Sequence, residues 1–333
     1  MSQFVVVVGD PLPAETLAAL RPDRYDVRHC DGSDPRALHA ALADAHALLI
    51  RSGTQVDAAA LAAAPHLRVV GRAGVGLDNV EVEAATRAGV LVANAPHSNV
   101  LSVAELTVGL IITSLRKVSA AGASLRAGRW DRSSFKGTEL SGKTVGIVGF
   151  GNVGKLVARR LAAFDVELLA YDPYVTSQEM ALLGARRAQL GELMSGSDVV
   201  TVHLPKNPAT TGLIGRRELG LAKSTLHLVN TSRGGIVDET ALLEALREGR
   251  VAGAALDVFE VEPAVGSPLL DLDSVTATPH LGASTAEAQD RAGREAVEAV
   301  RGALEGAPVD HAVNAAEVVV SSRVPASVPV PVP

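Results

Sequence analysis

The sequence predicts an α/β protein built on two doubly wound, parallel sheets. Short apolar runs alternate with stretches of helical periodicity through nearly all of the 333 residues, which favours parallel strands joined by helices. Polar side chains gather directly after the apolar runs, where ligands bind in such sheets. One stretch, residues 144–172, carries glycines in a spacing typical of a strand–turn–helix unit.

The first 97 residues repeat the strand–helix pattern. Apolar runs predict strands at residues 4–8, 26–29, 47–50, 67–70 and 90–92. A helix begins at Asp34-Pro35, because Asp is a favoured cap and Pro suits the first turn. Further helices are expected at residues 14–20, 56–64 and 80–88, followed by one or two long helices at 99–125.

Three polar side chains follow strands in this first part of the chain. Arg51, Arg72 and Asn94 each come just after an apolar run, so all three could face one crevice. Two arginines suggest an anionic ligand, because a guanidinium pairs with carboxylate or phosphate through two hydrogen bonds. Surface charges at loop ends explain the same spacing equally well.

The central stretch has the order strand, glycine turn, helix, strand, acid. After a strand at residues 145–148, Gly149 permits a tight turn, Gly151 lets a pyrophosphate approach the backbone, and Gly154 lets the helix pack closely. The helix start offers N–H groups to the phosphates. Asp172, 18 residues after Gly154, suits the ribose hydroxyls and would repel a 2′-phosphate. This Rossmann-like unit therefore predicts NAD rather than NADP.

Polar residues again follow the strands of the second part. Strands are expected at residues 198–203, 226–230, 251–257 and 275–278, and helices at 177–183 and 239–248. His280 suits removal of a hydroxyl proton, because histidine titrates near neutral pH. Glu262 could orient the imidazole and favour its protonated form. Arg233 could bind a substrate carboxylate and polarise its carbonyl oxygen.

Three motifs carry a resemblance to a known family. Asn230-Thr231-Ser232-Arg233, Phe259-Glu260-Val261-Glu262-Pro263 and Pro279-His280-Leu281-Gly282 resemble the Arg, Glu and His motifs of the D-2-hydroxyacid dehydrogenases. The stretches 71–79 and 130–137 resemble those of the family members that oxidise 3-phospho-D-glycerate. The likeness covers residues 3 to about 316.

The resemblance implies roles for individual residues. It makes His280 the acid/base, Glu262 its support, and Arg233 the group that binds the substrate carboxylate and carbonyl. The nicotinamide amide is expected near Asp257. The implied cofactor positions are Val75, Gly149, Gly151, Asn152, Val153, Gly154, Asp172, His203, Leu204, Thr231, Ser232, Arg233, Asp257, His280, Gly282 and Ala283. The implied substrate positions are Arg51, Arg72, Ala73, Gly74, Asn94, Arg233 and His280, with Arg132 offered from another subunit.

The resemblance also implies a domain organisation. A discontinuous substrate-binding domain is expected at residues 1–97 and 283–316, and an NAD-binding domain at 98–282. A homodimer or homotetramer follows from the same likeness. Longer family members continue into regulatory domains that can bind serine. Here residues 317–333 are rich in Pro and Val and predict a disordered tail, so serine feedback is not expected.

Composition excludes several classes of protein. The net charge of −6 and the absence of a basic block argue against a nucleic-acid partner. The N-terminus lacks the basic region of a signal peptide, and no apolar run reaches membrane-spanning length, so a cytoplasmic protein is expected. Cys30 is the single cysteine, which excludes an intramolecular disulfide, and no metal site is predicted.

Alternatives to oxidation of 3-phosphoglycerate remain open. One is a sister enzyme that reduces hydroxypyruvate, glyoxylate or another small 2-oxo acid, although two arginines favour a phosphorylated substrate. Another is an NAD-sensing, corepressor-like scaffold, because such proteins share the fold and the Arg, Glu and His residues. Trp130 lies in an irregular, basic stretch at residues 128–137, where local packing and anchoring of a partner subunit are equally supported.

Overall fold

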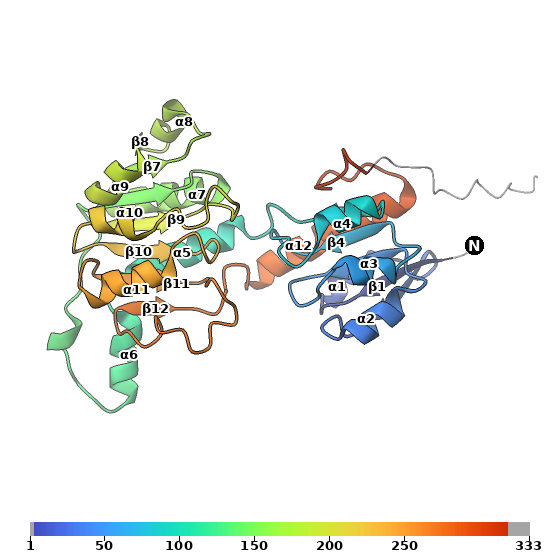
Figure 1. Cartoon of the computed structure of the whole chain (residues 1–333), viewed down its shortest axis with the longest axis horizontal. Helices are drawn as coiled ribbons and strands as arrows, with labels where there is room; N and C mark the ends of the chain where they lie inside the picture. The colour runs from blue at the N-terminus through green and yellow to red at the C-terminus, as the bar shows by residue number, and fades with distance from the viewer. Residues whose placement is uncertain (1–2, 319–333) are drawn as a thin grey trace, which may run out of the picture. The chain divides into compact units, whose positions relative to one another are not determined.

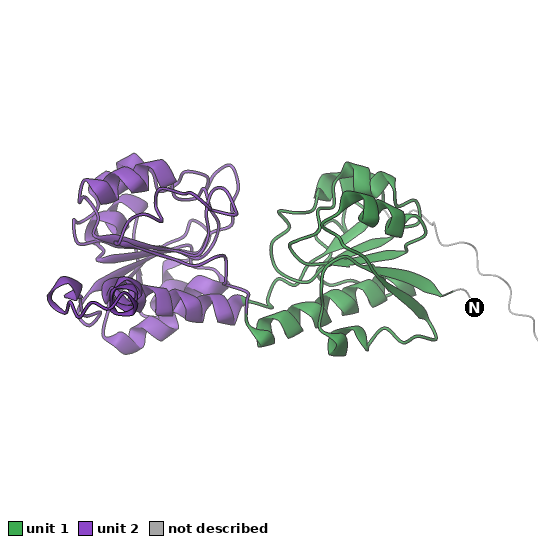
Figure 2. Ribbon diagram, turned by 90° about the horizontal axis from the view of Figure 1, so that it is seen from below, with its two compact units in different colours: residues 1–99, 285–333 green, residues 100–284 purple. Residues whose placement is uncertain are grey.

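The computed structural model describes residues 3–318 and divides the chain into two α/β units (Figures 1 and 2). Unit 1 combines the chain up to Asn99 with the chain from Thr285 onward, and unit 2 runs from Val100 to Ser284. Each unit holds one sheet with helices on both faces, so the predicted fold class is confirmed. The predicted tail lies outside the described residues, except for Glu317 and Val318.

Unit 1 holds a five-stranded parallel sheet. Its order is β2 (Tyr25–His29), β1 (Phe4–Val8), β3 (Ala47–Ile50), β4 (Val69–Arg72) and β5 (Leu91–Ala93). One face packs on α1 (Ala14–Leu17) and α12 (Ala286–Glu305). The other face packs on α2 (Pro35–Leu42), α3 (Ala58–Ala62) and α4 (Val82–Arg87).

The returning chain also covers the edge strand β5. Ala312 pairs with Ala93 in an antiparallel bridge, and the Val313 N–H donates to the carbonyl of Val92 at 2.8 Å. The Asn314 side chain, 1% exposed, accepts from the Val92 N–H at 2.9 Å and donates to the carbonyl of Val90 at 3.0 Å. Backbone groups at this edge are therefore satisfied within the unit.

Unit 2 holds a seven-stranded parallel sheet. Its order is β12 (Val275–Ala277), β11 (Gly253–Leu256), β10 (His227–Asn230), β9 (Val199–Val202), β6 (Thr144–Val148), β7 (Glu167–Tyr171) and β8 (Ala185–Arg187). The strand order reverses between β6 and β9, the position at which such sheets bind ligands.

Helices cover both faces of this second sheet. One face packs on α5 (Val100–Leu115) and α7 (Asn152–Leu161), and the other on α9 (Leu190–Gly196), α10 (Arg216–Leu221) and α11 (Glu239–Arg247). The remaining elements are α6 (Val118–Arg126), η1 (Ser133–Phe135), η2 (Ala162–Phe164) and α8 (Ser177–Ala181). Figure 1 shows α6 projecting from the rest of unit 2.

Several boundaries differ from the prediction. The predicted cap of α2 is confirmed, because the Asp34 carboxylate accepts from the Arg36 N–H at 2.9 Å. Helix α1 ends at Leu17 rather than residue 20, since the chain turns there toward β2. Arg72 is the last residue of β4, not the start of the following loop, because Ile50 pairs with it. Elements β8, α9 and α10 were not predicted.

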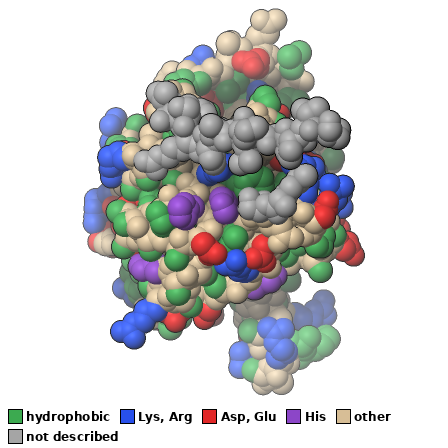
Figure 3. Space-filling model, turned by 90° about the vertical axis from the view of Figure 1, so that its right-hand side faces the viewer, with side chains coloured by type: hydrophobic (Ala, Val, Ile, Leu, Met, Phe, Trp, Pro, Cys, Tyr) green, Lys and Arg blue, Asp and Glu red, His purple; other side chains and the backbone are tan. Residues whose placement is uncertain are grey.

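One face of the molecule has mixed charge. Figure 3 shows Lys and Arg side chains interspersed with Asp and Glu rather than gathered in one basic patch. No helix within residues 3–318 is long and apolar enough to cross a membrane.

Candidate active site

The glycine turn follows β6 and opens onto the start of α7. Gly149 has φ +93°, and a Cβ added there would lie 2.4 Å from the carbonyl oxygen of His203. A Cβ at Gly154 would lie 2.2 Å from the carbonyl oxygen of Gly149. At Gly151, by contrast, an added Cβ meets no atom within 4 Å. Two glycines thus permit tight packing, and the third leaves its backbone open to a ligand.

Asp172 closes the glycine turn at the end of β7. Its side chain is mostly buried, and its two oxygens accept from the N–H groups of Phe150 and Tyr174, each at 2.8 Å. Carboxylate oxygens have further lone pairs, so each can still accept from a ribose hydroxyl. Together with the open backbone at Gly151 and the ten-residue helix α7, this acid fits a dinucleotide.

The turn after β10 is organised by Asn230, which is 2% exposed. The Asn230 amide donates to the carbonyl of Arg233 at 2.9 Å, and its oxygen accepts from the Ser232 hydroxyl at 2.8 Å. The buried Thr231 hydroxyl lies 2.8 Å from that of Thr107 in α5. These contacts fix the backbone from which the Arg233 side chain projects.

Glu262 and His280 come together from loops that follow neighbouring strands. Glu262 Oε2 lies 2.7 Å from His280 Nδ1, and Glu262 Oε1 accepts from the Phe259 N–H at 3.0 Å. His280 has φ +54°, and its side chain is 45% exposed, against 36% for Glu262. Because Nδ1 is engaged by a carboxylate, Nε2 is the ring nitrogen left to exchange a proton with a substrate.

Asp257, fully buried at the end of β11, holds the loop that carries His280. Its carboxylate accepts from the Thr278 hydroxyl at 2.6 Å, the Leu281 N–H at 2.7 Å and the Gly282 N–H at 2.8 Å. An added Cβ at Gly282 would lie 3.3 Å from this carboxylate, so the loop approaches Asp257 closely. Ala283 follows directly.

His203 directly follows β9, the strand beside β6, and contacts Thr201, whose hydroxyl lies 3.0 Å from His203 Nε2. Burial lowers the pKa of His203 to about 3. The imidazole is therefore neutral at working pH and suits contact with a ligand better than proton transfer. Leu204, next in the chain, packs against the position of Gly149.

In unit 1, Arg51 and Arg72 lie at the ends of adjacent strands, since Ile50 of β3 pairs with Arg72 of β4. The Arg51 backbone is fixed from both sides. Its N–H donates to the Asp10 carboxylate at 2.7 Å, and its carbonyl accepts from the Asn79 amide at 2.9 Å. No role was assigned to Asp10 or Asn79 from the sequence. Asp10 could have been found, because it follows β1 closely, as the candidate arginines follow their strands.

The loop after β4 brings the other predicted substrate positions together. The Arg72 guanidinium lies over Gly74, where an added Cβ would be 1.8 Å from Nη1. The Asn94 amide donates to the carbonyl of Val75 at 2.7 Å. Ala73, between Arg72 and Gly74 in the chain, is buried. Val75, predicted to line the cofactor, thus belongs to unit 1.

Two further features bear on the predicted sites. Arg132 and Trp130 lie in the exposed stretch between α6 and β6, and Trp130 is 79% exposed. Arg187 of β8, which was not predicted, places Nη2 3.5 Å from the backbone oxygen of Asp172. It lies 15 residues beyond Asp172 in the chain, whereas the sequence reasoning considered only the residues directly after Asp172 as a source of a basic group.

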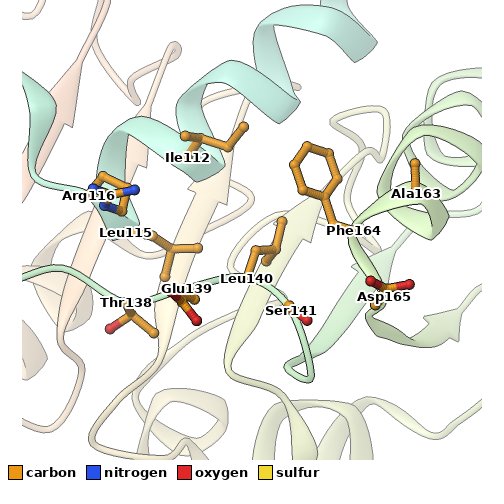
Figure 4. Close-up of a pocket in the computed structure, with 10 residues that line it drawn as sticks. All are labelled: Ile112, Leu115, Arg116, Thr138, Glu139, Leu140, Ser141, Ala163, Phe164 and Asp165. Carbon is orange, nitrogen blue, oxygen red and sulfur yellow. The ribbon is translucent and has the colours of Figure 1, made fainter.

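One hollow of about 380 Å³ lies away from the glycine turn. Its lining comes from the end of α5, the chain before β6 and the chain before β7 (Figure 4). These are the amino ends of β6 and β7, whereas Gly149 follows the carboxyl end of β6. The hollow is therefore distinct from the predicted dinucleotide site.

Residues 108–282 match the family model described as the NAD-binding domain of D-isomer-specific 2-hydroxyacid dehydrogenases. The chain belongs to this family, which confirms the resemblance carried by the three motifs. It is 53% identical over 324 residues to D-3-phosphoglycerate dehydrogenase of Mycobacterium tuberculosis strain H37Rv. That alignment covers 97% of this chain and 61% of the relative, so the chain spans about three fifths of the relative's length.

Solved structures share the fold over nearly the whole chain. The TT0316 protein of Thermus thermophilus superposes with a TM-score of 0.84 at 32% identity, covering 93% of this chain and 100% of that one. D-lactate dehydrogenase of Aquifex aeolicus, solved with NAD and lactic acid, has a TM-score of 0.79 at 26% identity, with coverages of 91% and 96%.

Proposed function

We propose that the chain catalyses the NAD-dependent oxidation of 3-phospho-D-glycerate to 3-phosphohydroxypyruvate, the first step of the phosphorylated route to serine. The observation that carries the dehydrogenase chemistry is the 2.7 Å contact between His280 Nδ1 and Glu262 Oε2. The choice of substrate rests on the similarity to D-3-phosphoglycerate dehydrogenases and on the adjacent Arg51 and Arg72.

The residues of unit 2 divide the chemistry among themselves. His280 Nε2 accepts the hydroxyl proton of the substrate, and the Glu262 carboxylate stabilises the imidazolium that forms. Arg233 pairs with the substrate carboxylate and polarises the oxygen that becomes a carbonyl. NAD, when bound, supplies the acceptor for the hydride. The residues that would hold NAD are Gly149, Gly151 and Gly154, together with the start of α7 and Asp172. The remaining implied cofactor positions complete the lining of the NAD site.

Arg51 and Arg72 define the phosphate end of the substrate. Each guanidinium can make two charge-assisted hydrogen bonds to a phosphate, which a non-phosphorylated acid cannot use. Removal of one such contact is expected to lower kcat/KM by about 10- to 100-fold, since hydrogen bonds to charged groups contribute about 1.5–3 kcal/mol.

The test is NADH formation at alkaline pH with 3-phosphoglycerate, D-glycerate and D-lactate, for the wild type, Arg72→Ala and the control Arg87→Ala. Arg87 is exposed in the last turn of α4 and should leave activity unchanged. We expect the wild type to prefer the phosphorylated acid and Arg72→Ala to lose this preference. A better reaction with D-glycerate or D-lactate, unaffected by Arg72→Ala, would remove the phosphate assignment and favour a general 2-hydroxyacid dehydrogenase. Normal NAD binding without turnover of any of these acids would favour the alternative of an NAD-sensing, corepressor-like scaffold.

The proposal includes a homodimer or homotetramer in which Arg132 acts across subunits. The stretch from α6 to β6 exposes Val118, Leu125 and Trp130, apolar side chains that a second copy would cover. Mixing inactive Arg132→Ala and His280→Ala proteins should restore activity, because each hybrid then holds one complete site. No recovery after subunit exchange would place Arg132 in its own subunit's site or outside it. A cytoplasmic location, tested by cell fractionation, belongs to the same proposal.

A further inference from the structure

The segment that carries Glu262 packs on the turn that carries Arg233. An added Cβ at Gly234 would lie 1.8 Å from the Phe259 carbonyl oxygen and 2.5 Å from the Glu260 nitrogen. The peptide group between Phe259 and Glu260 therefore rests directly on the Gly234 backbone. Only a residue without a side chain permits this approach, so the two predicted functional loops share one packing contact.

A second residue holds the same peptide group from another element. Glu239 stands in the first turn of α11, and its Oε1 accepts from the N–H of Glu260. The preceding N–H, of Phe259, donates to Glu262 at 3.0 Å, and Glu262 in turn faces His280 at 2.7 Å. A continuous series of contacts thus runs from Glu239 through the segment 259–262 to His280.

The surroundings of Glu239 disfavour its charged form, yet its hydrogen bond with the Glu260 N–H does not require that charge. Burial raises the pKa of Glu239, and the carboxylates of Glu260 and Glu262 add to this, while the Glu260 N–H and Lys206 oppose it. A carboxyl oxygen accepts a hydrogen bond in both protonation states. The contact with Glu260 is therefore kept whichever state Glu239 adopts.

We propose that Glu239 is a positioning residue for the acid/base pair: it anchors the segment 259–262 so that Glu262 reaches His280 Nδ1. This inference rests on the proposed dehydrogenase function and adds a residue to it. Loss of the anchor should lower kcat, because displacement of a reacting group by about 1 Å can reduce the rate by up to about 100-fold. We expect NAD affinity to stay unchanged, since the glycine turn and Asp172 lie in other loops, after β6 and at the end of β7.

Three variants separate the parts of the anchor. Glu239→Ala removes the acceptor, Glu239→Asp keeps an acid in the first turn of α11 but is one methylene too short, and Glu239→Gln keeps an acceptor oxygen at full length. We expect kcat to fall about 10- to 100-fold in the first two and less than about threefold in Glu239→Gln. The control Glu248→Ala, which loses an exposed ion pair with Arg250 at the end of the same helix, should retain full kcat.

A double-mutant cycle with Glu262→Gln shows whether Glu239 acts through Glu262. If it does, adding Glu239→Ala to Glu262→Gln should reduce kcat no further, with the KM for NAD unchanged throughout. Fold-losses that multiply in the double variant, or full kcat in Glu239→Ala and Glu239→Asp, would overturn the inference. If Glu262→Gln itself leaves kcat unchanged, the proposed function fails instead, so the two failures are distinguishable. Should Glu239→Ala not fold, Glu239→Asp carries the same comparison.

Discussion

Gly154→Ala should disrupt both the fold of unit 2 and its affinity for NAD. The new Cβ would lie 2.2 Å from the Gly149 carbonyl oxygen and 3.3 Å from the Ile147 side chain. Contacts below 3.0 Å are essentially never made by real Cβ atoms, so backbone must move by about 0.8 Å. Both neighbours belong to β6 and its turn, which the sheet holds in place.

The magnitude follows from the kind of contact. Overpacking of a rigid site costs about 1–3 kcal/mol, and here no flexible side chain can give way to relieve it. The same displacement moves the first N–H groups of α7 away from their phosphate-binding positions. Loss of one hydrogen bond to a charged phosphate costs about 1.5–3 kcal/mol, so the Kd for NAD should rise at least about tenfold.

Gly151→Ala provides the matched comparison. An added Cβ there meets no atom within 4 Å, and its φ of −77° suits any residue. Stability should change by less than about 1 kcal/mol, the usual difference between Gly and Ala as an N-cap. The methyl group would nevertheless occupy the approach of a pyrophosphate, so NAD affinity should fall as in Gly154→Ala.

Urea unfolding followed by circular dichroism, together with calorimetric titration of NAD, measures both quantities. Gly109→Ala, in the open middle of α5, is the control: it should keep NAD affinity and be at least as stable as the wild type, because Ala is favoured over Gly inside a helix by about 1 kcal/mol. The reasoning is refuted if Gly151→Ala binds NAD as tightly as the wild type, or if Gly154→Ala unfolds at the wild-type urea concentration. The first result would remove the ligand role of Gly151, and the second the tight packing at Gly154.

Three further perturbations test other contacts. His203→Gln should reduce the loss of stability on acidification. The pKa of His203 is about 3 in the folded chain but near 6.5 in the unfolded chain. Between these pH values the unfolded chain binds more protons than the folded chain, so acid destabilises the wild type there. Asn314→Ala should cost about 1–3 kcal/mol in urea unfolding of unit 1, because a buried N–H of β5 loses its acceptor. Asp172→Ala should raise the Kd for NAD about 10- to 100-fold, because the glycine turn loses its anchor and the ribose an acceptor.

Each of these expectations has a contrary outcome. Parallel stability curves for the wild type and His203→Gln between pH 7 and about 4 would show that His203 binds protons equally in both states. Unchanged unfolding of Asn314→Ala would show that the returning chain is dispensable for β5. Unaltered NAD affinity in Asp172→Ala would assign this carboxylate to structure alone.

The sequence specified the sheets better than the segments between them. Buried parallel strands read as continuous apolar runs, and those at β1, β3, β6 and β10 were located to within a residue or two. Strand β8, Ala185–Arg187, carries two arginines and lies at the sheet edge, so no apolar run marks it. Short helices such as α10 offer too few turns for a periodic pattern to stand out.

The candidate site shows the same division. That His280 and Glu262 lie close follows from the sheet, because β11 and β12 are neighbours and the loops after them share one edge. Which side chain holds which loop does not follow, since this depends on hydrogen bonds between residues far apart in sequence. Asp257 illustrates the limit: the family resemblance implied a position beside the cofactor, but gave no sign that its carboxylate accepts three hydrogen bonds from the His280 loop.

Acidic residues at the carboxyl ends of these strands divide by what their oxygens face. Asp10, Asp172 and Asp257 all accept backbone N–H groups that lie beyond the reach of the strand ladders, so they fix loop geometry. Glu262 uses one oxygen in the same way but turns the other to an imidazole. The hydrogen bonds described for the three aspartates come from backbone N–H groups and, for Asp257, also from a hydroxyl, whereas Glu262 turns one oxygen to a titratable side chain and so can influence proton transfer. This difference supports the role in acid/base chemistry that we propose for Glu262, and any effect of Glu262 on His280 depends on the residues that hold its segment in place.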